Sequence, residues 1–305
     1  MISARRDASG ALAIEAAAVR DIPEDTIGDA AVRDADFVAA ILEDLRRELG
    51  DKQRSCVLAL APMSASLRVV RIPKMTDAER RSAARFEAER FVPWDTKDVA
   101  TLVRSHWVNP AENALAVGVV REDALLSRVT CAKRAGLRVC GVDHEACALQ
   151  RAFPIADAVL DVGLRRSTIH AFSPNGPLSL VVPSGGNDVT RAIGHDLTIE
   201  QSAAERRKRI LGTAGAGESA RQTLVERVRG AVATLRDRLP VRRIALVGNG
   251  ARLPGLAGDI ETATEAIVEL TVSDLLQSSV YPADVTRAAA PDWTLAAALT
   301  IWSAP

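Results

Sequence analysis

The sequence of 305 residues is poor in aromatic side chains and has no excess of charge of either sign. Aromatic residues make up 3% of it, which argues against the stacking platforms that bind single-stranded nucleic acids. Lys and Arg together number 39, and so do Asp and Glu, so the formal net charge at pH 7 is zero. Because nucleic-acid binders usually carry a basic excess, we expect no nucleic acid among the partners of this protein.

Cysteines and long apolar runs are scarce as well. The four cysteines form no C-x-x-C pair and lie among apolar residues, as expected for reduced, buried thiols: Cys56, Cys131, Cys140 and Cys147. No apolar run approaches the roughly 18 residues that a membrane-spanning helix needs, and the first residues lack the apolar segment of a signal peptide. We therefore expect a cytoplasmic protein that reaches a membrane only through its partners.

The chain does contain enough apolar material for sizeable cores. Hydrophobic residues make up 48% of it, and the length suggests two domains. Strand-like and helix-like stretches alternate, which predicts an α/β fold. We expect a first domain at 1–153 and a second at 154–305, divided at Pro154.

The first domain is expected to contain a small inserted subdomain. The patterns first predict a hairpin within 3–19 that turns at 7–10, and a helix at 34–49. Strands are predicted at 56–61, 67–72, 99–108 and 115–120. Helices are predicted from the capping box Thr76–Glu79 to a point before Pro93, at 122–135 and at 145–151. Residues 66–140 make a β-α-β-β-α pattern by themselves. We therefore expect a compact α+β subdomain there.

The second domain repeats the strand and helix alternation. Strands are predicted at 158–162, 168–172, 178–182 and 244–247. Helices are predicted after Gly185, after a second capping box at Thr198–Gln201, and at 218–239, with a flexible connector at 212–217. The last predicted element is an apolar docking helix at 293–302. Two of these strands end in glycine turns, Asp161-Val-Gly163 and Gly248-Asn-Gly250.

These turns carry the candidate site. Asp161 at a strand end can hold a hydrated divalent cation, and Gly163 with Ser167 lets backbone and hydroxyl approach a phosphate. A glycine turn before a helix start, as at 248–250, also suits an anion. Plain steric turns without a ligand would also explain both stretches. Glu205 and Lys208, three apart on one helix face, suit either a ribose contact or an ordinary surface pair.

Other chemistry is not visible in the sequence. The four histidines have no metal-ligand spacing, and no Gly-x-Ser-x-Gly or Walker pattern occurs. From the residues alone, the chain is a two-lobed α/β protein with a candidate nucleotide cleft.

Six segments occur along the chain in a recognisable order: Phe86–Trp94 (FEAERFVPW), Val142–Leu149, Leu160–Gly163, Gly185–Thr190, Ala204–Lys208 and Leu246–Leu256 (LVGNGARLPGL). Together these segments resemble the PilM family of actin-like type IV pilus assembly proteins. The first and the last are the more specific, because glycine loops occur in all actin-like proteins. The resemblance implies an actin-like ATPase fold, with two ribonuclease-H-like lobes and the inserted subdomain. It also implies a scaffold that binds the N-terminal tail of the inner-membrane protein PilN, with pilus motor ATPases and the platform protein as further partners.

The resemblance also implies a site for ATP with Mg²⁺. Carried over by position, Asp161, Gly163 and Ser167 form the phosphate loop, and Asp161 is also the expected metal ligand. Glu205 and Lys208 belong to the helix that contacts ribose and adenine. Gly248, Gly250 and Arg252 belong to the turn on the adenosine side. No catalytic residue is implied. We expect ATP binding with little hydrolysis.

The chain departs from the family pattern in two places. The family opens with a strand carrying Asp-Ile-Gly, the first phosphate loop, which we expect to be missing here, either because the start is truncated or because this member has lost half of its phosphate grip. Leu164-Arg165-Arg166 replaces the usual small residues, so that the arginines either grip phosphates or close the pocket.

Three other functions stay open at this point. A GspL-like secretion component shares the lobes, but would continue into a transmembrane helix. An active actin-like phosphotransferase needs the first phosphate loop and a general base. An FtsA-like division protein needs a basic amphipathic C-terminal helix, and 293–302 has no basic face.

Overall fold

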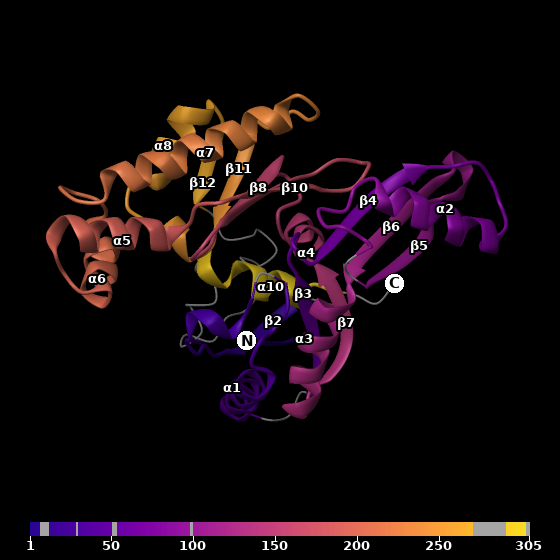
Figure 1. Ribbon diagram of the computed structural model, residues 1–305, viewed down its shortest axis with the longest axis horizontal. Helices are drawn as coiled ribbons and strands as arrows, with labels where there is room; N and C mark the ends of the chain where they lie inside the picture. The colour runs from indigo at the N-terminus through magenta and orange to yellow at the C-terminus, as the bar shows by residue number, and fades with distance from the viewer. Residues whose placement is uncertain (7–11, 29, 51–53, 98–99, 271–290, 303–305) are drawn as a thin grey trace. The chain divides into compact units, whose positions relative to one another are not determined.

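The computed structural model describes residues 1–6, 12–28, 30–50, 54–97, 100–270 and 291–302. The chain forms two compact units (Figure 1). The first unit comprises residues 1–148, 174–177 and 299–305, and the second comprises 149–173 and 178–298.

The first unit contains two small sheets in addition to the subdomain. Strands β1 and β2 form an antiparallel hairpin, whereas β3 and β7 pair in parallel. The elements are β1 Ile2–Arg6, β2 Leu12–Ala17, η1 Glu24–Thr26, α1 Ala35–Glu48, β3 Ser55–Leu60, α3 Glu122–Arg134, β7 Arg138–His144 and the first half of α4 Glu145–Ala152, which continues into the second unit. The expected hairpin is confirmed, while its turn at 7–10 lies outside the described residues. Helices α1 and α3 pack together, and an apolar cluster of Leu42, Cys56, Leu58, Ala132 and Val139 joins them to the parallel pair.

Strand β7 is the element of this unit that the sequence patterns missed. Its centre is Gly141, a residue that weakens the strand pattern because it has no side chain to pack. In the structure an aromatic ring takes that space: a Cβ on Gly141 would lie 2.5 Å from Cζ2 and 2.7 Å from Cε2 of Trp302. Gly141 is thus a site of close approach for the C-terminal Trp302.

Gly141→Ala is therefore expected to lower the free energy of unfolding by about 2 kcal/mol, as overpacking against a ring does. The measurement is urea unfolding followed by far-ultraviolet circular dichroism. In a Trp302→Ala background the same change should cost less than about 0.5 kcal/mol, because the ring is gone. An equal cost in both backgrounds would show that Trp302 is not the obstacle.

The stretch expected to form an inserted subdomain, 66–140, contains a three-stranded antiparallel sheet in the order β4-β6-β5, and its last helix, α3, packs against α1. The sheet and the segments that connect its strands comprise β4 Ala65–Arg71, α2 Asp77–Glu89, β5 Thr101–Asn109, η2 Pro110–Glu112 and β6 Ala114–Arg121. Leu115, Val117 and Val119 of the central strand are fully buried together with Ala84 and Ala88 of α2. The predicted capping box is confirmed, because Thr76 and Glu79 exchange hydrogen bonds at the start of α2.

The second unit is built on one five-stranded sheet in the order β10-β9-β8-β11-β12. Strands β8, β9 and β10 pair antiparallel, and β11 is parallel to both β8 and β12. The elements are β8 Ala158–Val162, β9 Ser167–Ala171, β10 Leu178–Val182, α5 Gly186–Leu197, α6 Gln201–Leu211, α7 Glu218–Arg236, β11 Arg243–Val247, η3 Asn249–Arg252, α8 Leu256–Thr264, β12 Ile267–Leu270, η5 Pro291–Trp293 and α10 Thr294–Thr300.

The two central strands of this sheet are almost wholly apolar, as strands covered on both faces should be. In β8 and β11, Leu160, Val162, Ile244 and Leu246 are buried and form one core with residues of α5, α7 and α8. Helix α7 packs against β9 and β10, α8 packs against β12, and α5 contacts both α6 and α7 (Figure 1). The α/β prediction is confirmed.

Two local predictions in this unit were wrong. Thr198 does not open a capping box: it ends α5 in the left-handed conformation, with φ +54°, and α6 begins after Glu200 without a side-chain cap. The glycine-rich connector at 212–217 is a packed turn rather than a flexible linker, since Thr213 and Ala216 are buried. Thr213 is held there by hydrogen bonds with Glu218 and Arg221.

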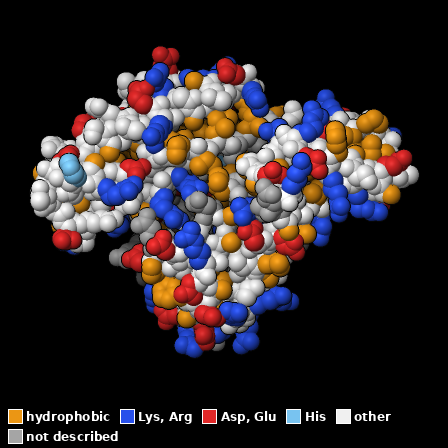
Figure 2. Space-filling model, in the orientation of Figure 1, with side chains coloured by type: hydrophobic (Ala, Val, Ile, Leu, Met, Phe, Trp, Pro, Cys, Tyr) orange, Lys and Arg blue, Asp and Glu red, His pale blue; other side chains and the backbone are white. Residues whose placement is uncertain are grey.

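The surface charge and the helices agree with the balanced, moderately apolar composition of the sequence. Basic and acidic side chains are interspersed over much of the visible face (Figure 2). Among the described residues, no helix combines the length and the apolarity that crossing a membrane requires.

Candidate functional site

The two glycine turns meet at one edge of the five-stranded sheet. Because β8 and β11 are parallel neighbours, with Val247 opposite Asp161, the turns that follow them lie side by side. The β8–β9 turn is closed by the Gly163 N–H, which donates to Arg166 O at 3.1 Å. The carbonyl of Gly163 in turn accepts from the Gly186 N–H at 2.9 Å, which fixes the start of α5 beside the turn.

Gly248 makes the close approach of the two turns feasible. Its φ of +88° is a conformation that residues with a side chain rarely adopt. A Cβ at this position would overlap Asp161 Oδ1 and lie 2.7 Å from Val162 O. A Cβ on Gly250 would likewise lie 2.8 Å from Val162 O. Gly248 and Gly250 are thus both required because a side chain at either position would clash with the β8 strand end.

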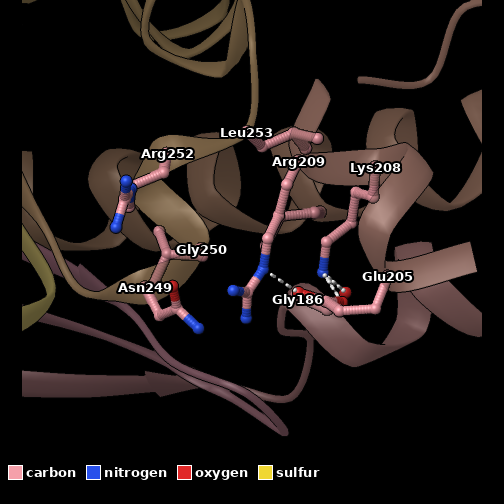
Figure 3. Close-up of a pocket in the computed structure, with 10 residues that line it drawn as sticks. Gly186, Glu205, Lys208, Arg209, Asn249, Gly250, Arg252 and Leu253 are labelled. Atoms are coloured by element: carbon pink, nitrogen blue, oxygen red, sulfur yellow. Dashed lines mark hydrogen bonds and ion pairs between the residues drawn. The ribbon is translucent and has the colours of Figure 1, made fainter. Parts of the chain in front are cut away.

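A pocket of about 210 Å³ opens between the turn after β11 and helices α5 and α6 (Figure 3). Its lining comprises Val162, Gly186, Glu205, Lys208, Arg209, Leu224, Asn249, Gly250, Arg252 and Leu253. All of these residues belong to the second unit. The lining is mixed, with cationic, amide and apolar groups, as small-molecule sites are.

One wall of the pocket is a charged network on α6. Lys208 is 7% exposed, and its Nζ contacts Glu205 Oε2 at 2.7 Å (Figure 3). Glu205 Oε1 accepts from Arg209 Nε at 2.9 Å. Burial alone would raise the pKa of Glu205, but hydrogen bonds from Lys208, Thr190 and Arg209 outweigh it and lower the pKa to about 2. Glu205 is therefore an ionised acceptor at neutral pH.

The opposite wall is the η3 turn, which carries Asn249 and Arg252. The Arg252 guanidinium, 57% exposed, lies 3.5 Å from Asp292. In Figure 3 the Arg209 side chain extends between Asn249 and Glu205. Two guanidinium groups thus border the opening of the pocket, and none of the lining residues is aromatic.

The residues expected from the sequence fall into three groups. Glu205, Lys208, Gly250 and Arg252 line the pocket, and Asp161, Gly163 and Gly248 adjoin it at the paired turns. Ser167 is fully buried and donates to Ser184 O at 2.8 Å, so its hydroxyl is used within the fold. Gly186, Thr190, Arg209 and Asn249 were not predicted as site residues, although the first two lie in the Gly185–Thr190 segment and Asn249 in the Gly248-Asn-Gly250 turn. The Gly185-Gly186 pair before a helix was the available signal for the first two.

Asp161 is the acidic group at the paired turns. Its residue is half-buried, and burial of the carboxyl raises its pKa from 3.8 to about 6. A buried carboxylate without a cation near it opposes folding when it ionises. This is the environment that a metal ion or another cation would relieve.

Asp161→Asn is expected to raise the free energy of unfolding of the ligand-free protein by about 2 to 3 kcal/mol above pH 6. The unfolded chain ionises at a pKa of 3.8 and the folded one at about 6, so the wild type loses this stability as pH rises through that window. Urea unfolding across the window measures the difference. The two proteins should be equal below pH 3.8, and a constant difference at all pH values would contradict the assignment.

The chain was compared with protein families, solved structures and curated proteins. The family model of type IV pilus assembly protein PilM matches residues 1–173. A chain in the solved structure of a PilM–PilN type IV pilus biogenesis complex is similar over 98% of this chain and 94% of its own length, with 22% identity and a TM-score of 0.81. The ethanolamine utilization protein EutJ from Carboxydothermus hydrogenoformans is similar over 91% and 78%, with 13% identity and a TM-score of 0.55. No curated protein matches the chain.

These similarities confirm the expected actin-like α/β fold. The match to the family model spans more than half of the chain and includes the Phe86–Trp94 segment. The chain therefore belongs to the family of type IV pilus assembly protein PilM.

Proposed function

We propose that the protein is a scaffold of the type IV pilus assembly platform, which it joins by binding the N-terminal tail of a PilN-type inner-membrane protein. The observation that carries this is the similarity over 98% of the chain to a chain of a PilM–PilN complex. Such a protein works at the cytoplasmic side of the inner membrane and reaches it through its partner. The family match favours this function over a GspL-like secretion component.

Binding of the tail tests the proposal. A synthetic peptide with the cytoplasmic N-terminal sequence of the PilN-type protein from the same organism is titrated into the purified chain in a calorimeter. We expect saturable binding, and none with a scrambled peptide of the same composition. Equal heats for both peptides, or none for either, would reject the scaffold function.

We further propose that the pocket of the second unit binds the adenosine part of ATP. Its walls fit that group: Glu205 offers an ionised acceptor to ribose hydroxyls, and the Arg209 and Arg252 guanidiniums can stack on a base in the absence of aromatic rings. The site extends toward Asp161, which would hold Mg²⁺ together with the ATP phosphates.

The acidic residues near the pocket favour a metal ion that binds together with the nucleotide over one that the protein holds alone. Among the described residues, no group of three or more His, Cys, Asp or Glu side chains is placed to hold a metal ion. Mg²⁺ would then arrive with the nucleotide, which supplies most of its oxygen ligands. We propose that occupancy of the site, rather than rapid hydrolysis, regulates the scaffold. Calorimetry with ATP and Mg²⁺, and release of inorganic phosphate, measure the two separately; rapid phosphate release would overturn the second statement.

A further inference from the structure

Thr190 is a buried hydroxyl directly behind the charged wall of the pocket. It lies on α5, one turn after Gly186, and is 1% exposed. Its Oγ1 is 2.7 Å from Lys208 Nζ, 2.6 Å from Glu205 Oε2 and 3.1 Å from Gly186 O. Thr190 therefore connects the start of α5 to both charged groups of α6.

The protons of this network can be assigned from its donors. A lysine ammonium has three N–H groups, and Lys208 Nζ has three acceptors: Gly186 O at 2.9 Å, Thr190 Oγ1 at 2.7 Å and Glu205 Oε2 at 2.7 Å. Lys208 has no further proton to offer a ligand. Its role is to hold the wall together, which differs from the direct ribose contact expected from the sequence.

The single proton of Thr190 goes to Glu205. The hydroxyl accepts from Lys208, so it must donate elsewhere, and the ionised Glu205 oxygen at 2.6 Å is a stronger acceptor than the Gly186 carbonyl at 3.1 Å. Glu205 Oε2 is thus fixed from two sides. The remaining oxygen, Oε1, is left to Arg209 and the pocket (Figure 3).

Oε1 is the atom that a ligand can reach. Arg209, its present partner, is 61% exposed and can swing away, whereas Thr190 and Lys208 are buried. A carboxylate oxygen accepts more than one hydrogen bond. Fixing one oxygen of Glu205 in this way presents the other to a ligand with neighbouring hydroxyls.

We infer that Thr190 is a positioning residue, which sets the orientation of Glu205 and thereby makes the pocket selective for a vicinal diol such as the ribose of a nucleotide. This rests on the nucleotide binding proposed above. Lys208 alone does not fix the carboxylate, because Glu205 can rotate about a single ammonium contact. The Thr190 hydroxyl removes that freedom.

The test compares two ligands on three proteins. ADP and 2′,3′-dideoxy-ADP, each with Mg²⁺, are titrated by calorimetry into the wild type, Thr190→Val and Thr190→Ser. We expect the wild type to prefer ADP by about tenfold, the worth of one good hydrogen bond to a charged group. Thr190→Val should reduce this ratio to about one, while Thr190→Ser keeps it.

The ratio separates positioning from stability. A purely structural Thr190 would weaken both ligands equally and leave the ratio as in the wild type, which would overturn the inference. If the wild type binds neither nucleotide, the proposed nucleotide site fails as well. If the wild type binds both nucleotides and Thr190→Val keeps the same ratio of affinities as the wild type, the nucleotide site stands and only the positioning role of Thr190 fails. Thr190→Ala, which also lacks a donor, replaces Thr190→Val if that variant does not fold, with the same outcomes.

Discussion

Gly248→Ala is expected to lower the free energy of unfolding by about 4 kcal/mol and to abolish ligand binding in the pocket. Two costs add. The backbone at φ +88° and ψ 166° is nearly restricted to glycine. The new methyl group would also overlap Asp161 Oδ1 and lie 2.7 Å from the O and 2.9 Å from the N of Val162. The Val162 atoms belong to a central strand and cannot move aside cheaply.

Gly230→Ala is the matched control for this prediction. Gly230 lies within α7, and a Cβ there would meet no atom within 4 Å. The same substitution should therefore stabilise by roughly 0.5 to 1 kcal/mol, as alanine does in a helix interior. Urea unfolding of the two variants measures both changes in the free energy of unfolding, the expected decrease for Gly248→Ala and the expected increase for Gly230→Ala. A small effect of Gly248→Ala would mean that the paired turns rearrange easily and that Asp161 and Val162 do not restrict the space at Gly248.

The sequence predicted the sheet of the second unit better than the site that the sheet carries. Strands β8 and β11 are short apolar runs followed by glycine, so their existence and their turns are local properties. The pairing of Asp161 with Gly248 follows once the strands are taken as parallel neighbours. Burial of Lys208 does not follow, because it depends on the start of α5, some twenty residues earlier in the chain.

Thr190 and Thr198 show the limit of local patterns in opposite ways. Thr198 satisfies the capping-box pattern, yet the chain reverses there between α5 and α6, and a left-handed residue ends the first helix. Thr190 fits no capping or helix-face pattern that would predict its contacts, yet it contacts residues fifteen and eighteen positions later. Both outcomes are decided by how α5 and α6 pack.

Lys208→Met is expected to lower the free energy of unfolding by about 3 to 5 kcal/mol at neutral pH. Methionine fills a similar volume but donates no hydrogen bond. Glu205, Thr190 and the Gly186 carbonyl each lose a contact shorter than 3 Å, and an ionised carboxylate stays behind without its ammonium. Arg209→Ala is the control: it removes the exposed partner of the same carboxylate and should cost less than about 1 kcal/mol.

The pH dependence separates this loss of charge pairing from loss of packing. Glu205 has a pKa of 4.5 in the unfolded chain and about 2 in the folded one, so it stabilises the wild type above pH 4.5, and this stability is lost as pH falls toward 2. Without Lys208 the folded pKa rises, and the carboxyl can protonate where the wild type cannot. The gap between wild type and Lys208→Met should therefore narrow as pH falls through 4.5. A gap that stays constant in acid would mean that Lys208 contributes packing rather than charge, and the ordering of Glu205 by Lys208 and Thr190 would lose its electrostatic basis.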